Sequence, residues 1–290
     1  MPLVGTGPLA STAAAEERGL GAFNVIQLEH ITAIVAAAED VVAPVVLQIS
    51  ENTAHYHGGL RPLAVAALAA AEAASVPVSV HLDHATSPML VREAVALGIP
   101  SVMYDASTLP YDANVSATAA LVEHCHGASV WVEAELGEVG GKDGVHAPGV
   151  RTDPAQAAAF VDATGVDGLA VAVGTSHAMV VRDAALDFGL ISALRAELPV
   201  PLVLHGSSGV SDADLTRAIG HGMTKINIST HLNATFTGAV RSDLLARPRS
   251  VDPRRYLAAG RAAMRNEVAR LLRLLGSRAA QPTVADRMPG

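Results

Sequence analysis

Short apolar runs that recur along the whole chain are the feature that most constrains its fold. Eight such runs have the length and character of buried strands. They cover residues 22–25, 45–49, 78–82, 101–104, 130–136, 169–173, 202–204 and 225–228. Alanine-rich segments with helical spacing separate them, as at 29–41, 60–74, 87–97, 112–126 and 154–164. This alternation predicts a parallel sheet whose outer face is covered by helices.

Eight strand–helix units that close on themselves predict an α/β fold, a (β/α)8 TIM barrel. An open, doubly wound sheet receives no support, because no Gly-x-Gly-x-x-Gly turn follows the first strand. The 290 residues, half of them hydrophobic, are expected to form a single domain around one large core. Two extra helical segments, 231–245 and 253–275, follow the eighth strand, and a polar tail is expected from about residue 277.

The charge and cysteine content narrow the possible partners and compartment. A formal net charge of -8 argues against a nucleic-acid-binding surface. The single cysteine, Cys125, excludes an internal disulfide and fits a reducing cytosol. The N-terminus lacks the pattern of a secretory signal, and no apolar run approaches the ~18 residues of a membrane span. We therefore expect a cytoplasmic protein without nucleic-acid or membrane partners.

Ionisable residues gather where the predicted strands end, most densely in His81-Leu82-Asp83-His84. The carboxyl ends of the strands form the active face of a barrel of this kind. His177 and His205 follow the sixth and seventh strands, so with His84 three histidines reach one rim. Three histidines match a catalytic zinc that keeps one coordination position open. His81 lies deeper and is expected to be a hydrogen-bonded core residue.

Other strand ends carry carboxylates, amides and hydroxyls. Glu133 and Glu135 share parity on the fifth strand and should face the same way. The glycine- and serine-rich turns after the seventh and eighth strands can expose backbone N–H groups to a phosphate. Alone these turns are weak signals, but beside a metal site they indicate a phosphorylated substrate.

The motifs resemble those of the class II, metal-dependent ketose-bisphosphate aldolases, which act on fructose and tagatose bisphosphates. The resemblance covers most of the chain, from about residue 21 to residue 254. It rests on six motifs in the order of that family, HLDH (81–84), SVMYD (101–105), VEAELG (132–137), GTSH (174–177), HGSSG (205–209) and KIN (225–227).

The resemblance implies a site for catalytic Zn2+ held by His84, His177 and His205. It implies Asp83 as the acid/base, Glu135 as a catalytic carboxylate near the metal, and Asp105 as a ligand of a second metal position. The residues expected to contact substrate are Asn24, Ser50, Ala178, Gly206, Ser208, Asn227, Ser229, Thr230 and Arg254. Arg254 would come from a partner subunit, which implies a homodimer or homotetramer. A monovalent cation, Na+ or K+, is expected near the phosphate.

The reaction implied is reversible cleavage of a ketose 1,6-bisphosphate, first of all fructose 1,6-bisphosphate, to dihydroxyacetone phosphate and glyceraldehyde 3-phosphate. Zinc would stabilise the enediolate, and Asp83 would carry the proton of the C4 hydroxyl. At two positions that bear on the choice of substrate, the sequence differs from the usual pattern of the family. Ala178 stands where the family usually has glycine, and in a shortened loop Asp143 is the candidate for the family's catalytic glutamate. Tagatose 1,6-bisphosphate or another phosphorylated ketose therefore remains an alternative.

Two rival functions stay open at this point. A Schiff-base aldolase needs an active-site lysine, and the chain offers only Lys142 and Lys225. A non-catalytic, sugar-phosphate-binding barrel could retain the metal residues without turnover.

Overall fold

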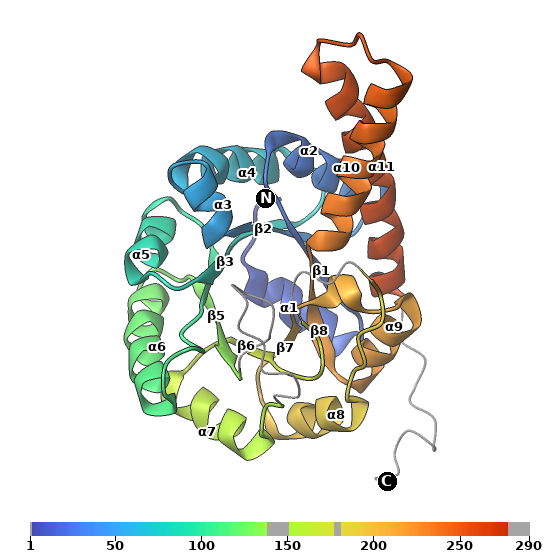
Figure 1. Cartoon of the computed structure of the whole chain (residues 1–290). Coiled ribbons are helices and arrows are strands. Elements are labelled where there is room, and N and C mark those ends of the chain that lie inside the picture. Colours follow the sequence, from blue (N-terminus) through green and yellow to red (C-terminus); the bar gives the residue numbers. More distant parts are fainter. Residues whose placement is uncertain (1, 138–150, 177–180, 278–290) are drawn as a thin grey trace.

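Eight parallel strands form a closed barrel in chain order in the computed structural model, which describes residues 2–137, 151–176 and 181–277 (Figure 1). This architecture confirms the (β/α)8 prediction. The strands are β1 (Leu20–Asn24), β2 (Val45–Ser50), β3 (Val78–Ala85), β4 (Ser101–Tyr104), β5 (Trp131–Leu136), β6 (Gly168–Val171), β7 (Leu202–Leu204) and β8 (Met223–Ile228).

Helices surround the barrel as an outer ring (Figure 1). They are α1 (Thr6–Ala15), α2 (Leu28–Val41), α3 (Glu51–Tyr56), α4 (Arg61–Ala73), α5 (Pro88–Ala96), α6 (Tyr111–His126), α7 (Pro154–Thr164), α8 (Phe188–Glu197), α9 (Asp212–His221), α10 (Thr230–Ala246) and α11 (Pro253–Gly276), with a 3₁₀ turn η1 (Ser207–Gly209). Ser87 and Asp153, each followed by proline, cap α5 and α7: they accept the backbone N–H of Leu90 and Gln156, respectively.

The main hydrophobic core lies between the strands and the helices, while much of the barrel interior is polar. Small apolar layers are present inside, such as Met103 with Ala170 and Val203. The interior also holds fully buried polar side chains. These are Gln48, His81, Ser101, Glu133 and Lys225. Buried polar side chains need hydrogen-bond partners, so we expect these side chains to form hydrogen bonds with one another.

Helix α1 closes the N-terminal end of the barrel, opposite the carboxyl ends of the strands. Its Ala10 and Ala13 pack on Leu20 of β1, and Thr6 hydrogen-bonds to the Ser79 hydroxyl at 2.9 Å. The ring of Trp131 lies against the backbones of α1 and β6. A Cβ atom at Gly7 would lie 2.9 Å from that ring, so only glycine permits this approach.

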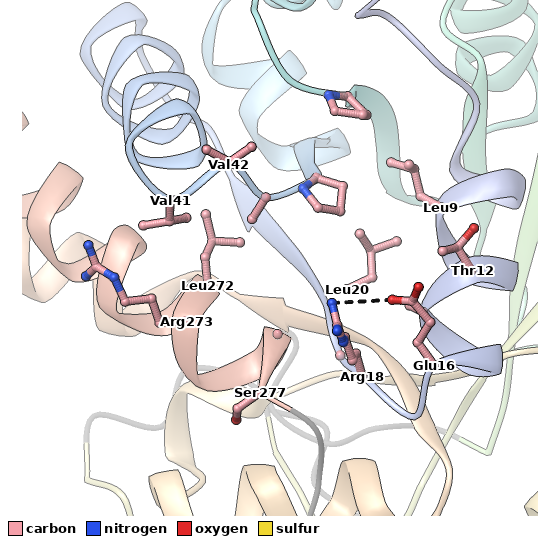
Figure 2. Close-up of a pocket in the computed structure, with 16 residues that line it drawn as sticks. Leu9, Thr12, Glu16, Arg18, Leu20, Val41, Val42, Leu272, Arg273 and Ser277 are labelled. Carbon is pink, nitrogen blue, oxygen red and sulfur yellow. Dashed lines mark ion pairs between the residues drawn. The ribbon is translucent and has the colours of Figure 1, made fainter.

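A cavity of about 560 Å³ lies at the same N-terminal end, beside α1 and the last turn of α11 (Figure 2). Its walls are mostly apolar, with Leu9, Leu20 and Leu272 among them. Arg18 at its edge is paired with Glu16 at 3.4 Å. In barrels of this type the N-terminal end contributes to stability, whereas the active site lies at the C-terminal end. The polar strand-end residues of this protein lie at that C-terminal end.

Helices α10 and α11 run side by side and project beyond the ring as an arm (Figure 1). Both match the extra C-terminal helices expected from the sequence. The expected polar tail lies outside the described residues after Ser277. Among the helices of the described ranges, none has the length and apolar character needed to span a membrane.

Candidate active site

A bulge in β3 brings Asp83 and His84 to the same side of the strand. In the pairing of β3 with β4, Leu82 lies opposite Val102 and Ala85 lies opposite Tyr104. Two residues of β3 therefore face one residue of β4, which defines a β-bulge. His84 has φ of 49°, a left-handed conformation that is uncommon for a residue with a side chain. This irregularity allows the adjacent residues Asp83 and His84 to share one site.

Two clusters of potential metal ligands, buried except for the partly buried His84, share that histidine. One contains Asp83, His84 and His205, and the other contains His84, Asp105 and Glu135; within each cluster, one ligand atom from every residue lies within 4.8 Å of the others. The rings of His84 and His205 are 4.4 Å apart between centroids. Imidazole nitrogens with carboxylate oxygens form a donor set that suits zinc. The residues present therefore fit the metal that the sequence predicts.

Asp105 orients His84. The Nδ1 atom of His84 lies 3.0 Å from Asp105 Oδ2 and is positioned to donate to it. The other oxygen of Asp105 accepts hydrogen bonds from the N–H and hydroxyl of Ser107. A carboxylate on one ring nitrogen leaves the opposite nitrogen, Nε2, for a metal. Asp105 thus has a visible contact with His84, while its direct role as a ligand stays a prediction.

Asp83 is buried, and its two carboxylate oxygens have different surroundings. Asn24 donates to Oδ2 at 2.8 Å, and Gln48 donates to Asn24 at 3.2 Å. Oδ1 has no hydrogen-bond partner in the described part of the chain. Burial raises the pKa of Asp83, but the nearby His84, His205 and Lys225 outweigh it and hold the pKa well below its usual range. Asp83 is therefore an anion with one oxygen available to accept a proton.

His205, at the end of β7, is held from below by Glu133. Its Nε2 atom lies 2.9 Å from Glu133 Oε1, and Glu133 Oε2 accepts a hydrogen bond from Lys225 Nζ at 2.9 Å. Burial and the neighbouring His84 lower the pKa of His205 to about 4. Burial alone would raise the pKa of Glu133, but the charge of Lys225 and the hydrogen bond with His205 outweigh this effect and lower the pKa to about 2. The site thus holds an ionised carboxylate beside a neutral imidazole.

His81 is a core residue, as expected. It is fully buried, and its Nδ1 atom bonds to the Ser101 hydroxyl at 2.6 Å. Lys225 is equally buried and paired with Glu133, so its ammonium is not exposed to an open site. This pairing is unfavourable for Schiff-base chemistry at Lys225, while Lys142 lies outside the described residues.

The predicted phosphate residues meet at the N-terminus of α10. Ser208 Oγ accepts the backbone N–H groups of Ser229 and His231, both at 3.2 Å, and Thr230 begins the helix between them. Gly206 has φ of 67°, a conformation that glycine adopts readily. Backbone N–H groups at a helix N-terminus bind anions well.

Gly206 also links two of the predicted ligand loops. A Cβ atom at Gly206 would lie 2.6 Å from the carbonyl oxygen of Ser176. Ser176 precedes His177, and Gly206 follows His205, so the two loops are in contact next to their histidines. His177, Ala178 and Asp143 themselves lie outside the described residues, and their roles remain predictions.

Three further predicted substrate residues occupy different places. Asn227 lies on β8, with its amide nitrogen 3.2 Å from Nε2 and 3.4 Å from Nδ1 of His205. Ser50 caps α3 by accepting the N–H of Thr53. Arg254 lies on the projecting arm, where its side chain is 89% exposed and paired with Asp252. That exposure is compatible with the expectation that it serves another subunit.

Sequence reasoning assigned no role to Glu51, although it follows β2 directly. Its carboxylate is largely buried and accepts both the backbone N–H and the hydroxyl of Thr86. Thr86 lies two residues after His84, so Glu51 fixes the chain just beyond the bulge. A carboxylate at the C-terminal end of a strand was the only signal in the sequence, and it did not indicate the partner.

Comparison with known proteins agrees with this geometry. The family model for class II fructose-bisphosphate aldolases matches residues 5–280. The YdjI aldolase of Escherichia coli K12 is 31% identical over 95% of this chain and 98% of its own, with a TM-score of 0.84. A candidate fructose-1,6-biphosphate aldolase of Coccidioides immitis is 28% identical over 92% of this chain and 94% of its own (TM-score 0.82).

The fold is also shared with the fructose-bisphosphate aldolase of Campylobacter jejuni, which is 23% identical over 94% of this chain and 95% of that protein (TM-score 0.81). The match to the family model covers nearly the whole chain and includes every strand of the barrel. Together with the converging histidines and carboxylates at the strand ends, it establishes the relationship. The chain belongs to the class II fructose-bisphosphate aldolase family.

Proposed function

We propose that this protein is a zinc-dependent aldolase that reversibly cleaves a ketose 1,6-bisphosphate. Fructose 1,6-bisphosphate is the first candidate, giving dihydroxyacetone phosphate and glyceraldehyde 3-phosphate. The observation that carries the proposal is the bulge that places a carboxylate, Asp83, directly beside a metal-ligand histidine, His84. An aldolase of this class needs a proton acceptor and a metal at the same carbon–carbon bond.

The proton-transfer step is assigned to Asp83. Asn24 holds its Oδ2 atom, so Oδ1 is the atom that would take the C4 hydroxyl proton during cleavage and return it during condensation. The low pKa of the carboxyl group keeps it ionised before the proton transfer. Zinc bound by His84, His177 and His205 would supply a Lewis acid for the substrate carbonyl. Glu135, and Asp143 in its loop, are proposed as further catalytic carboxylates.

Phosphate binding is assigned to the turn around η1 and the first turn of α10. Ser208, Ser229 and Thr230 are close together there, and the helix N-terminus favours a dianion. A Na+ or K+ ion beside the phosphate would balance part of its charge. Ser50, Asn227 and Ala178 are proposed to contact the remainder of the substrate.

The far phosphate is assigned to Arg254 of a second subunit in a homodimer or homotetramer. Its arm also exposes the hydrophobic side chains of Leu245 and Val251, with relative exposures of 76% and 91%. Replacing Arg254 with alanine should raise the KM for a bisphosphate at least tenfold. The KM for the matching ketose 1-phosphate should stay unchanged, and an equal change for both substrates would contradict the assignment.

A test of the reaction uses metal-loaded wild type and Asp83→Ala with fructose and tagatose 1,6-bisphosphates. The wild type should release triose phosphate, and the variant should lose at least 100-fold in kcat while retaining zinc. Activity that survives EDTA, with borohydride trapping of a substrate adduct, would favour a Schiff-base aldolase. Binding without release of triose phosphate would favour the sugar-phosphate-binding alternative. A cytoplasmic location, without membrane or nucleic-acid partners, is proposed with this metabolic role.

A further inference from the structure

A fully buried lysine inside the barrel is not among the residues assigned to bind substrate or transfer a proton in the proposed reaction. Lys225 lies on β8 with an exposed fraction of 0%, and it donates to Glu133, which is also 0% exposed. Removing both charges from water is costly, and a buried ion pair is often no more stable than an apolar pair of similar volume. The pair therefore calls for an explanation beyond stability.

The pair is connected to the predicted metal site through a single hydrogen bond. Glu133 uses one carboxylate oxygen for Lys225 and the other for Nε2 of His205, each at 2.9 Å. An ionised carboxylate only accepts hydrogen bonds, so the proton of His205 must be on Nε2. The lone pair of the ring is then on Nδ1, which becomes the nitrogen able to bind a metal.

The surrounding residues show why a cation accompanies Glu133. Asp83, Asp105 and Glu135 are also buried around the same centre, so a further carboxylate adds to an already negative site. Lys225 balances the charge of Glu133 from the side opposite His205 and keeps it an anionic acceptor. His81 Nε2 is more distant from Glu133, at 3.8 Å, and bonds to Ser101 through its other nitrogen.

We propose that the Lys225–Glu133 pair is a positioning device that fixes the proton and the ring orientation of His205 for zinc binding. The inference rests on the proposed zinc-dependent function and adds two residues that touch neither metal nor substrate. Mutation of a carboxylate that hydrogen-bonds to a metal-bound histidine typically lowers metal affinity or activity by about 10–100-fold.

The test measures zinc affinity by competition with a chromogenic chelator in the intact protein, without any turnover. The variants are Glu133→Gln, Lys225→Met and the double variant, and the thermal stability of each is measured without metal. Either single variant should bind zinc about 10–100-fold more weakly. The double variant carries no unpaired buried charge, so its melting temperature should recover toward wild type while its zinc affinity stays low.

A matched control is Ser101→Ala, which removes a buried hydrogen bond of His81 at a similar depth and leaves the contact of Glu133 with His205 intact. It should keep wild-type zinc affinity. Cobalt-substituted protein gives a second readout, because an altered His205 ligand changes the visible spectrum of the metal.

The outcomes separate the two proposals. A folded double variant with wild-type zinc affinity and an unchanged cobalt spectrum would overturn the positioning role while leaving the proposed function intact. A wild type that binds no zinc would overturn both. Loss of zinc affinity that follows the melting temperature across all variants, Ser101→Ala included, would mean that the pair acts only on folding.

Discussion

Glu51 should control the metal site from outside it. Its carboxylate accepts two hydrogen bonds from Thr86 and holds the chain beyond the bulge, where His84 adopts its left-handed conformation. A hydrogen bond to a charged group contributes about 1.5–3 kcal/mol, so the two together contribute at least about 3 kcal/mol. The left-handed conformation of His84 costs about 1–2 kcal/mol. Without Glu51, a large part of the interactions that offset this cost is lost.

The expected effect of Glu51→Ala follows from these magnitudes. If the bent conformation of β3 is disfavoured by about 1.4 kcal/mol, roughly one molecule in ten adopts it. The apparent zinc affinity then falls by about tenfold. We expect about tenfold weaker zinc binding and a similar decrease in kcat/KM at limiting zinc. Thr86→Val removes only the hydroxyl contact, at 3.1 Å, and should have a smaller effect.

Chelator competition and steady-state kinetics measure both quantities. Glu93→Ala, which removes an exposed carboxylate from α5, is the matched control and should change neither. A correctly folded Glu51→Ala protein with unchanged zinc affinity and kcat/KM would show that the bend of β3 at His84 does not depend on Glu51.

Two further predictions concern the phosphate turn and the response to acid. Gly206→Ala places a Cβ atom 2.6 Å from the Ser176 carbonyl at a positive φ, so it should lower kcat/KM at least tenfold, and wild-type kinetics would contradict the assigned turn. Burial lowers the pKa of His30 to about 4, so the unfolded chain binds the extra proton between pH 6.5 and about 4. Stability should fall by up to about 3 kcal/mol as the pH decreases through this range, and denaturant titrations of His30→Asn should show a shallower decrease than wild type.

The barrel was predictable because its signal is local and repeated. Each buried strand of a parallel barrel needs a short apolar run, and each connection needs a helix, so the count of eight could be read along the chain. Helices α1 and α3 escaped the prediction. Thr6–Ala15 lacks a strong amphipathic pattern because it closes the barrel end, and Glu51–Tyr56 has only six residues.

The candidate site was predictable only in part. Asp83 and His84 are adjacent, so any site that needs both requires an irregular strand, and the bulge in β3 provides it. The partners of Glu133 could not be deduced in this way. His205 and Lys225 follow it by 72 and 92 residues, and parity along one strand does not reveal which side chains meet across a barrel.

The chain carries its own optical reporter at the closed end of the barrel. Trp131 is the single tryptophan, and its ring lies against Gly7 of α1 and the start of β6. It is 6.2 Å from the ring of His81, which separates it from the ligands above. Its fluorescence therefore reports whether α1 is docked on the barrel. Emission that shifts before activity is lost would show that the closed end of the barrel opens first.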